Sequence, residues 1–90
     1  MAKKKQQLTE VLAERKKQHG DFRDHSKIAQ ALKRVVKGGV SYHLLTDVEL
    51  EGLEMTLHKI ARIVSGDPHK KDHWVDIAGY NTLVGNTLED

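Results

Sequence analysis

The fold of this chain is decided by the stretch from Thr46 to Pro68, TDVELEGLEMTLHKIARIVSGDP. It opens with a capping box, because Glu49 is the third residue after Thr46. Apolar residues then recur at helical spacing on one stripe: Leu50, Leu53, Leu57, Ile60, Ala61 and Val64. The closing Gly-Asp-Pro run is a stop signal. The sequence therefore predicts an amphipathic helix of about twenty residues, the longest in the chain.

The same kind of pattern predicts three further helices. The helical repeat of apolar residues places them at about residues 6–18, 25–37 and 71–86, and glycines mark the end of each one. Asp24 or Ser26 is the expected N-cap of the second of these four helices. Many Leu, Ala, Lys and Glu residues, with a single Pro, favour helix over sheet throughout.

The remaining segments precede or join these helices. Residues 40–45 are interpreted as an extended loop packed onto the core. Residues 1–5 contain three consecutive lysines and are expected to form a flexible basic tail. Residues 6–90 then make one all-α domain, similar to a four-helix bundle. A chain of 90 residues buries only a modest core, which favours assembly into a homo-oligomer, a dimer or higher.

Composition excludes several classes of protein. The chain has no cysteine, so it can form neither disulfides nor thiolate zinc sites. No apolar run approaches membrane-spanning length, and no apolar secretory segment follows the basic N-terminus. The expectation is a cytoplasmic protein without a membrane partner. The six histidines are scattered and contain no HExxH pattern, so they are interpreted as surface or capping residues.

Charge is unevenly distributed, although the net charge is only +2. The basic residues gather in the first segment: Lys3, Lys4, Lys5, Arg15, Lys16 and Lys17. The acidic residues gather at the start of the third helix: Asp47, Glu49, Glu51 and Glu54. Such asymmetry would suit nucleic-acid binding, the pairing of one subunit with another, or simply a solvated helix face.

Two carboxylate pairs suggest a metal site. Glu51 and Glu54 share one side of the third helix, and Asp72 and Asp76 share one side of the fourth. The turn between these helices is short enough for a hairpin, in which the two acidic edges would face each other. Converging carboxylates suit Mg²⁺ or Mn²⁺. Ordinary salt bridges to Arg or Lys, or four separate surface carboxylates, are the alternatives.

Three blocks of the sequence resemble a known family. They are His19-Gly20-Asp21-Phe22, then Leu53-Glu54-Met55 with His58-Lys59-Ile60-Ala61-Arg62-Ile63, and Asp72-His73-Trp74-Val75-Asp76-Ile77-Ala78-Gly79-Tyr80. These blocks resemble a family of small phage and prophage proteins of unassigned function. That family is in turn similar to the all-α nucleotide pyrophosphohydrolases of the MazG type and to phage domains associated with nucleotide modification.

The resemblance implies roles for particular residues. Glu51, Glu54, Asp72 and Asp76 would hold Mg²⁺, with Glu54 and Asp76 as the catalytic pair. The spacing of four between the two aspartates departs from the three that is usual in the MazG superfamily. The nucleotide would be bound by five further side chains: Lys59, Arg62, His19, Asp21 and Tyr80.

Two functions are therefore expected as alternatives. The first is a phage-type, MazG-like nucleotide-binding protein that acts as a Mg²⁺-dependent (d)NTP pyrophosphohydrolase and releases NMP and pyrophosphate. The second is a non-catalytic phage protein that binds a nucleotide, nucleic acid or host protein and so modulates host or anti-phage processes. Turnover of a nucleotide in Mg²⁺ separates the first from the second.

Overall fold

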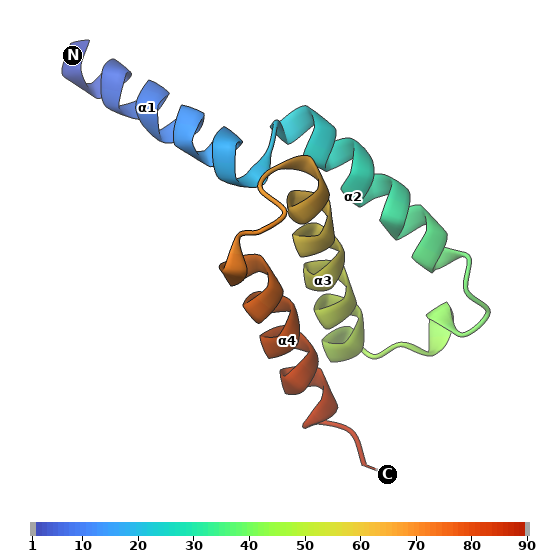
Figure 1. The fold of residues 1–90 in the computed structure, drawn as a ribbon. Coiled ribbons are helices and arrows are strands. Elements are labelled where there is room, and N and C mark those ends of the chain that lie inside the picture. Colours follow the sequence, from blue (N-terminus) through green and yellow to red (C-terminus); the bar gives the residue numbers. More distant parts are fainter. Residues whose placement is uncertain (1, 90) are drawn as a thin grey trace.

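The structure, a computed structural model, describes the backbone of residues 2–89 and the side chains of residues 7–89. This part of the chain is all-α, as expected, and has no strand (Figure 1). Its elements are the helices α1 (Ala2–His19), α2 (Phe22–Lys37), α3 (Asp47–Ser65) and α4 (Lys71–Gly85), with a 3₁₀ turn at Tyr42–Leu44. The first helix begins at Ala2, within the stretch expected to be a tail. The side chains of Lys3, Lys4 and Lys5 lie outside the described part.

Helix α3 begins as its sequence predicts. The Thr46 hydroxyl accepts a hydrogen bond from the Glu49 N–H at 3.2 Å, and the Glu49 carboxylate accepts one from the Thr46 N–H at 2.9 Å. These bonds satisfy two of the N–H groups that a helix start leaves without an intrahelical partner. The hydrogen bond from the Thr46 N–H is the largest cause that lowers the pKa of the Glu49 carboxyl. With 19 residues, α3 is the longest of the four helices.

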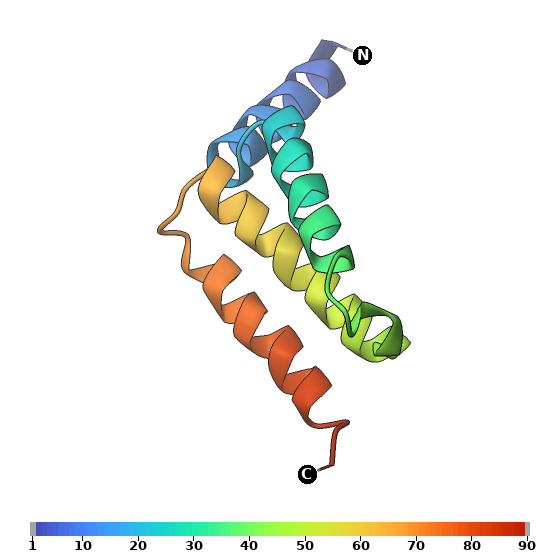
Figure 2. The ribbon, with the colours of Figure 1, turned by 90° about the vertical axis from the view of Figure 1, so that its right-hand side faces the viewer.

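Helix α3 is also the central element, with α2 on one side and α4 on the other (Figures 1 and 2). The buried apolar side chains among the described residues are Ala29 of α2 and Leu57, Ala61 and Ile63 of α3. Small residues in this set let the helix axes approach closely. A core of this size leaves many large apolar side chains at the surface.

Helices α3 and α4 form an antiparallel hairpin whose register is fixed along its length. Gly52 lies against Val84, and a Cβ atom at Gly52 would collide with the valine methyl group. Farther along, the Lys59 ammonium and the Asp76 carboxylate are 2.9 Å apart. The start of α3 therefore lies beside the end of α4, and the end of α3 beside the start of α4.

Helix α1 does not lie alongside the other three, which is a departure from the expected bundle (Figure 1). Only its C-terminal end is attached. Gly20 has a φ of +84°, and a Cβ atom there would meet the backbone of Ser65. The Asp67 N–H donates to the Gln18 carbonyl at 3.2 Å. The close approach of these two turns fixes the base of α1 on the end of α3 and directs the rest of α1 away.

Two local expectations were wrong. Helix α2 begins earlier than predicted, and its N-cap is Asp21 rather than Asp24 or Ser26. The segment 40–45 forms a 3₁₀ turn rather than an extended loop, and Val40 is 91% exposed instead of packed on the core. None of the helices in residues 2–89 has the length and apolar content needed to span a bilayer.

Candidate functional site

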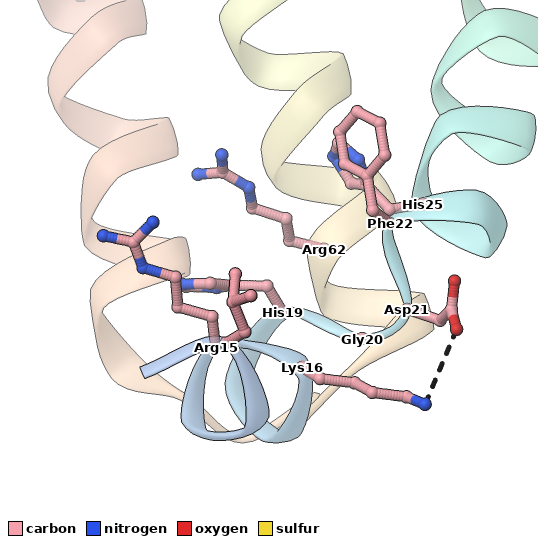
Figure 3. Close-up of a pocket in the computed structure, with 9 residues that line it drawn as sticks. Arg15, Lys16, His19, Gly20, Asp21, Phe22, His25 and Arg62 are labelled. Atoms are coloured by element: carbon pink, nitrogen blue, oxygen red, sulfur yellow. Dashed lines mark ion pairs between the residues drawn. The ribbon is translucent and has the colours of Figure 1, made fainter. Parts of the chain in front are cut away.

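A pocket lies where the turn between α1 and α2 meets the end of α3 (Figure 3). Its volume is about 520 Å³, within the usual range for ligand sites. The pocket is lined by Leu12, Arg15, Lys16, His19, Gly20, Asp21, Phe22, His25 and Arg62. With the histidines neutral, its three basic side chains and one acidic side chain give a formal charge of +2. A pocket with this lining favours an anionic ligand.

The turn that builds the pocket is held by Asp21. Its carboxylate accepts a hydrogen bond from the Arg23 N–H at 2.8 Å, and the Lys16 ammonium lies 3.6 Å away. The backbone hydrogen bond, followed by the charge of Lys16, lowers the pKa of the Asp21 carboxyl. Asp21 therefore caps α2 and forms an ion pair with Lys16. Both contacts are those of a structural residue, and a role of Asp21 in binding a nucleotide stays a prediction.

The two arginines of the pocket have no such partner. Within the part of the chain whose side chains are described, no carboxylate lies within 4.0 Å of the guanidinium of Arg15 or Arg62. Their head groups point to the same side of the view in Figure 3, whereas the Lys16–Asp21 pair lies on the other side. Two unpaired guanidinium groups in one pocket are suited to the oxygens of a phosphate.

Four histidines lie near enough to Arg62 to feel its charge, and they form two pairs. His19 Nδ1 and His73 Nε2 are 3.2 Å apart, so one nitrogen donates its N–H and the other accepts the hydrogen bond. The ring of His25 stacks on that of His58, with centroids 5.7 Å apart. His25 is 7% exposed and His73 1%. A backbone hydrogen bond partly offsets the effect of burial on the pKa of each of these two rings, from His58 for His25 and from Gln18 for His73.

Burial is the largest cause that lowers the pKa of each of these four histidines. The Arg62 guanidinium lowers all four pKa values further. The histidines are therefore neutral at pH 7, and the cationic charge of the pocket comes from its arginines and lysine. An anion bound beside Arg62 would offset that charge and make protonation of the neighbouring rings easier.

The predicted carboxylate site is not assembled within the chain. Asp76 is paired with Lys59, and its carboxyl pKa is lowered first by that contact. Asp72 is 80% exposed at its side chain and lies 4.0 Å from the Lys70 ammonium. Glu51 lines a groove between α3 and α4, whereas Glu54 lines a shallow recess on the α2 side.

The antiparallel register explains this separation. Asp76 lies beside Lys59, so the aspartate pair is level with the second half of α3, while the glutamate pair is in the first half. At 1.5 Å per residue, the two pairs are offset by roughly 8 to 18 Å along the hairpin. No three His, Asp or Glu side chains of the described residues form a group that could hold a metal ion. The donor set that the MazG resemblance implies for Mg²⁺ or Mn²⁺ therefore does not fit this arrangement.

The predicted nucleotide-binding residues divide among three places. His19, Asp21 and Arg62 come together at the pocket. Lys59 is 8% exposed, beneath the surface of the hairpin. Tyr80 is in the groove with Glu51, at the far end of α4.

Six of the nine lining residues were not among the predicted nucleotide-binding residues: Leu12, Arg15, Lys16, Gly20, Phe22 and His25. A signal for Arg15 was available, because residues four apart share a helix face and Arg15 precedes His19 by four. Phe22 was quoted as part of the His19-Gly20-Asp21-Phe22 block without a role of its own. No local pattern distinguishes His25, whose burial depends on the packing of α2 against α3.

Comparison with curated proteins and with solved structures finds no match. A family model, described as a domain of unknown function (DUF6378), matches residues 5–88. This range includes every residue of the pocket and both acidic pairs. The chain therefore belongs to the DUF6378 family.

Proposed function

We propose that this chain binds a nucleotide in the pocket at the α1–α2 turn, with the phosphates held by Arg15 and Arg62. One observation carries the proposal: the pocket holds two guanidinium groups without carboxylate partners. An anionic oxygen ligand would pair with both arginines.

Phe22 supplies the contact for the base. Its ring is 80% exposed at the rim of the pocket, although phenylalanine is usually buried. Its centroid is 6.0 Å from that of His25, so the two rings form an aromatic platform. Stacking of a base on an aromatic ring contributes about 1–3 kcal/mol and tolerates any base. The pocket thus combines a phosphate subsite with a stacking surface.

The sequence resemblance supports the choice of a nucleotide over other anions. We propose that the chain is a phage-type, MazG-like protein that acts in the host cytoplasm. We place it in the non-catalytic branch of the two expected functions, because its acidic pairs are offset along the hairpin and Asp76 is engaged by Lys59. On this proposal, binding requires no Mg²⁺ and leaves the nucleotide intact.

Isothermal titration calorimetry in EDTA tests this proposal, with the NTPs, the dNTPs and inorganic phosphate as ligands. We expect at least one nucleotide to bind without metal. Arg62→Gln should weaken binding by about tenfold or more, since a hydrogen bond to a charged group contributes about 1.5–3 kcal/mol. Phe22→Ala should weaken nucleotide binding and leave the affinity for inorganic phosphate unchanged.

Arg34→Gln is the matched control, because Arg34 is an exposed arginine of α2 that does not line the pocket. An equal loss in Arg34→Gln and Arg62→Gln would indicate general charge attraction and contradict the proposal. Pyrophosphate release in Mg²⁺ that disappears in Glu54→Ala would instead show a pyrophosphohydrolase. DNA binding that falls steeply with salt, without affinity for free nucleotides, would favour nucleic acid.

A further inference from the structure

The chain exposes more surface than a monomer of its size. Its accessible surface is 7220 Å² for a mass of 10.2 kDa. Folded monomers of that mass expose about 5,300 Å². The difference of about 1,900 Å² exceeds the roughly 800 Å² that each partner buries in a standard protein–protein interface. The fold therefore has surface available for a partner, and two regions of it are apolar.

The first region is a stripe on α1, defined by Leu8, Val11 and Leu12. These residues are 60%, 46% and 54% exposed. Their spacing of three and four places them on one side of the helix, in the pattern by which an amphipathic helix enters a groove. Because α1 is attached only at its C-terminal end, little of its own chain covers this stripe.

The second region is a groove between the start of α3 and the end of α4, with a volume of about 570 Å³. Its lining is mainly apolar, with two carboxylates: Val48, Gly52, Met55, Tyr80, Leu83, Val84, Asp47 and Glu51. Val48 and Leu83 are more than half exposed. Along α3 the groove runs from Asp47 to Met55, about 12 Å at 1.5 Å per residue. The stripe on α1 from Leu8 to Leu12 covers about 6 Å by the same measure, so it fits within the length of the groove.

The charges of α1 and of the first half of α3 indicate which surfaces would pair. The sequence of α1 has six Lys or Arg residues and two Glu residues, a formal charge of +4. The first half of α3, from Asp47 to Glu54, has four acidic residues and no basic one, a formal charge of −4. Two copies of α1 would repel each other, whereas α1 and this part of α3 attract. The attraction favours a second copy of this chain, which carries both surfaces.

We propose that two copies form an antiparallel dimer in which the α1 stripe of each copy lies in the α3–α4 groove of the other. Figure 1 shows the free end of α1 and the groove end of the α3–α4 hairpin at opposite ends of the molecule. The chain is 55 Å long and about half as wide. Antiparallel packing brings helix α1 of each copy, which we call the arm, beside the groove of the other copy. The contact is then made twice, as two-fold symmetry requires. This dimer does not depend on the proposed nucleotide.

The two surfaces can be inactivated separately. Val11→Asp damages the arm and keeps the groove, whereas Leu83→Asp damages the groove and keeps the arm. Analytical ultracentrifugation at tens of micromolar should show wild-type dimers, and each variant should raise the dimer Kd by roughly a hundredfold or more. A mixture of both variants should form heterodimers, because one intact arm still meets one intact groove. Val40→Asp is the control, since Val40 is exposed but belongs to neither surface.

A wild-type monomer at these concentrations would overturn the proposal, and so would an equal effect of Val40→Asp. Cysteine cross-linking gives an answer if the aspartate variants do not fold, because the natural chain has no cysteine. A mixture of Leu8→Cys chains and Val48→Cys chains should form mixed disulfide dimers on oxidation. Efficient cross-linking of Leu8→Cys to itself, without mixed dimers, would show that α1 pairs with α1 and contradict the proposal.

Discussion

Single residues decide how closely the helices of this chain approach. Gly52 and Gly79 are both inside helices, but their surroundings differ. A Cβ atom at Gly52 would collide with Val84 across the hairpin, whereas a Cβ atom at Gly79 would meet nothing within 4 Å. Gly79 lies in the block of sequence that carries the family resemblance, yet no packing contact within the chain requires a glycine there.

The two glycines therefore predict opposite effects of the same substitution. Gly52→Ala should destabilise the chain by about 1–3 kcal/mol, because the added methyl group separates α3 from α4. Gly79→Ala should stabilise it by up to about 1 kcal/mol through helix propensity. Urea unfolding of the two variants measures both effects. Equal midpoints would show that the close contact between Gly52 and Val84 is absent in solution.

The capping box gives a second test at the scale of a residue. Thr46→Ala removes the hydroxyl that accepts the Glu49 N–H, and should cost about 1 kcal/mol. Thr46→Ser keeps a hydroxyl at the same position and should retain most of the stability. The two unfolding midpoints can be compared directly. If both variants lose the same stability, the threonine methyl group rather than the cap is responsible.

At the scale of the elements, local sequence signals predicted the helices. They did not predict the features that depend on contacts between residues far apart in the sequence. Thr46 and Glu49 mark the start of α3 because the capping box involves only neighbours in sequence. Nothing local indicates that α1 stands apart, since its direction depends on Gly20 meeting Ser65. The metal site expected at the acidic pairs was not found for the same reason. Helical spacing shows which face of its helix a residue occupies, but the register of the hairpin determines its position along the hairpin axis.

One histidine pair joins α1 to α4 and another joins α2 to α3, and the pKa values of these four rings predict acid sensitivity. Lowered pKa values in the folded chain mean that the unfolded chain binds protons first, so stability falls as the pH drops below 6.5. The carboxyl groups with lowered pKa values start from 3.8 or 4.5, so they lose their stabilising effect at lower pH. The interval from pH 6.5 to about 5 therefore reports on the histidines.

Urea unfolding at pH 7.5, 6.5 and 5.5 measures this dependence. We expect the free energy of unfolding to fall across the series, and His73→Gln to make the fall shallower. His43→Gln is the control, because His43 is exposed and outside the cluster. Stability that is constant or rises on acidification would contradict the burial of neutral histidine rings.

At the scale of the whole molecule, the proposed dimer predicts that stability depends on assembly. If the arms exchange as proposed, the folded dimer is favoured by mass action, and the melting temperature should rise with protein concentration. Differential scanning calorimetry over a hundredfold range of concentration measures the rise. It should be absent in Leu83→Asp, and a melting temperature independent of concentration in the wild type would contradict the dimer.

The central claim is that phosphate oxygens bind to Arg15 and Arg62 and not to the acidic pairs of the hairpin. A crystal soaked with Mn²⁺ and a non-hydrolysable dNTP tests it most directly. We predict phosphate density between the two guanidinium groups, the base against Phe22, and no manganese peak between α3 and α4. Phosphates and manganese held together by Glu51, Glu54, Asp72 and Asp76 would contradict the account.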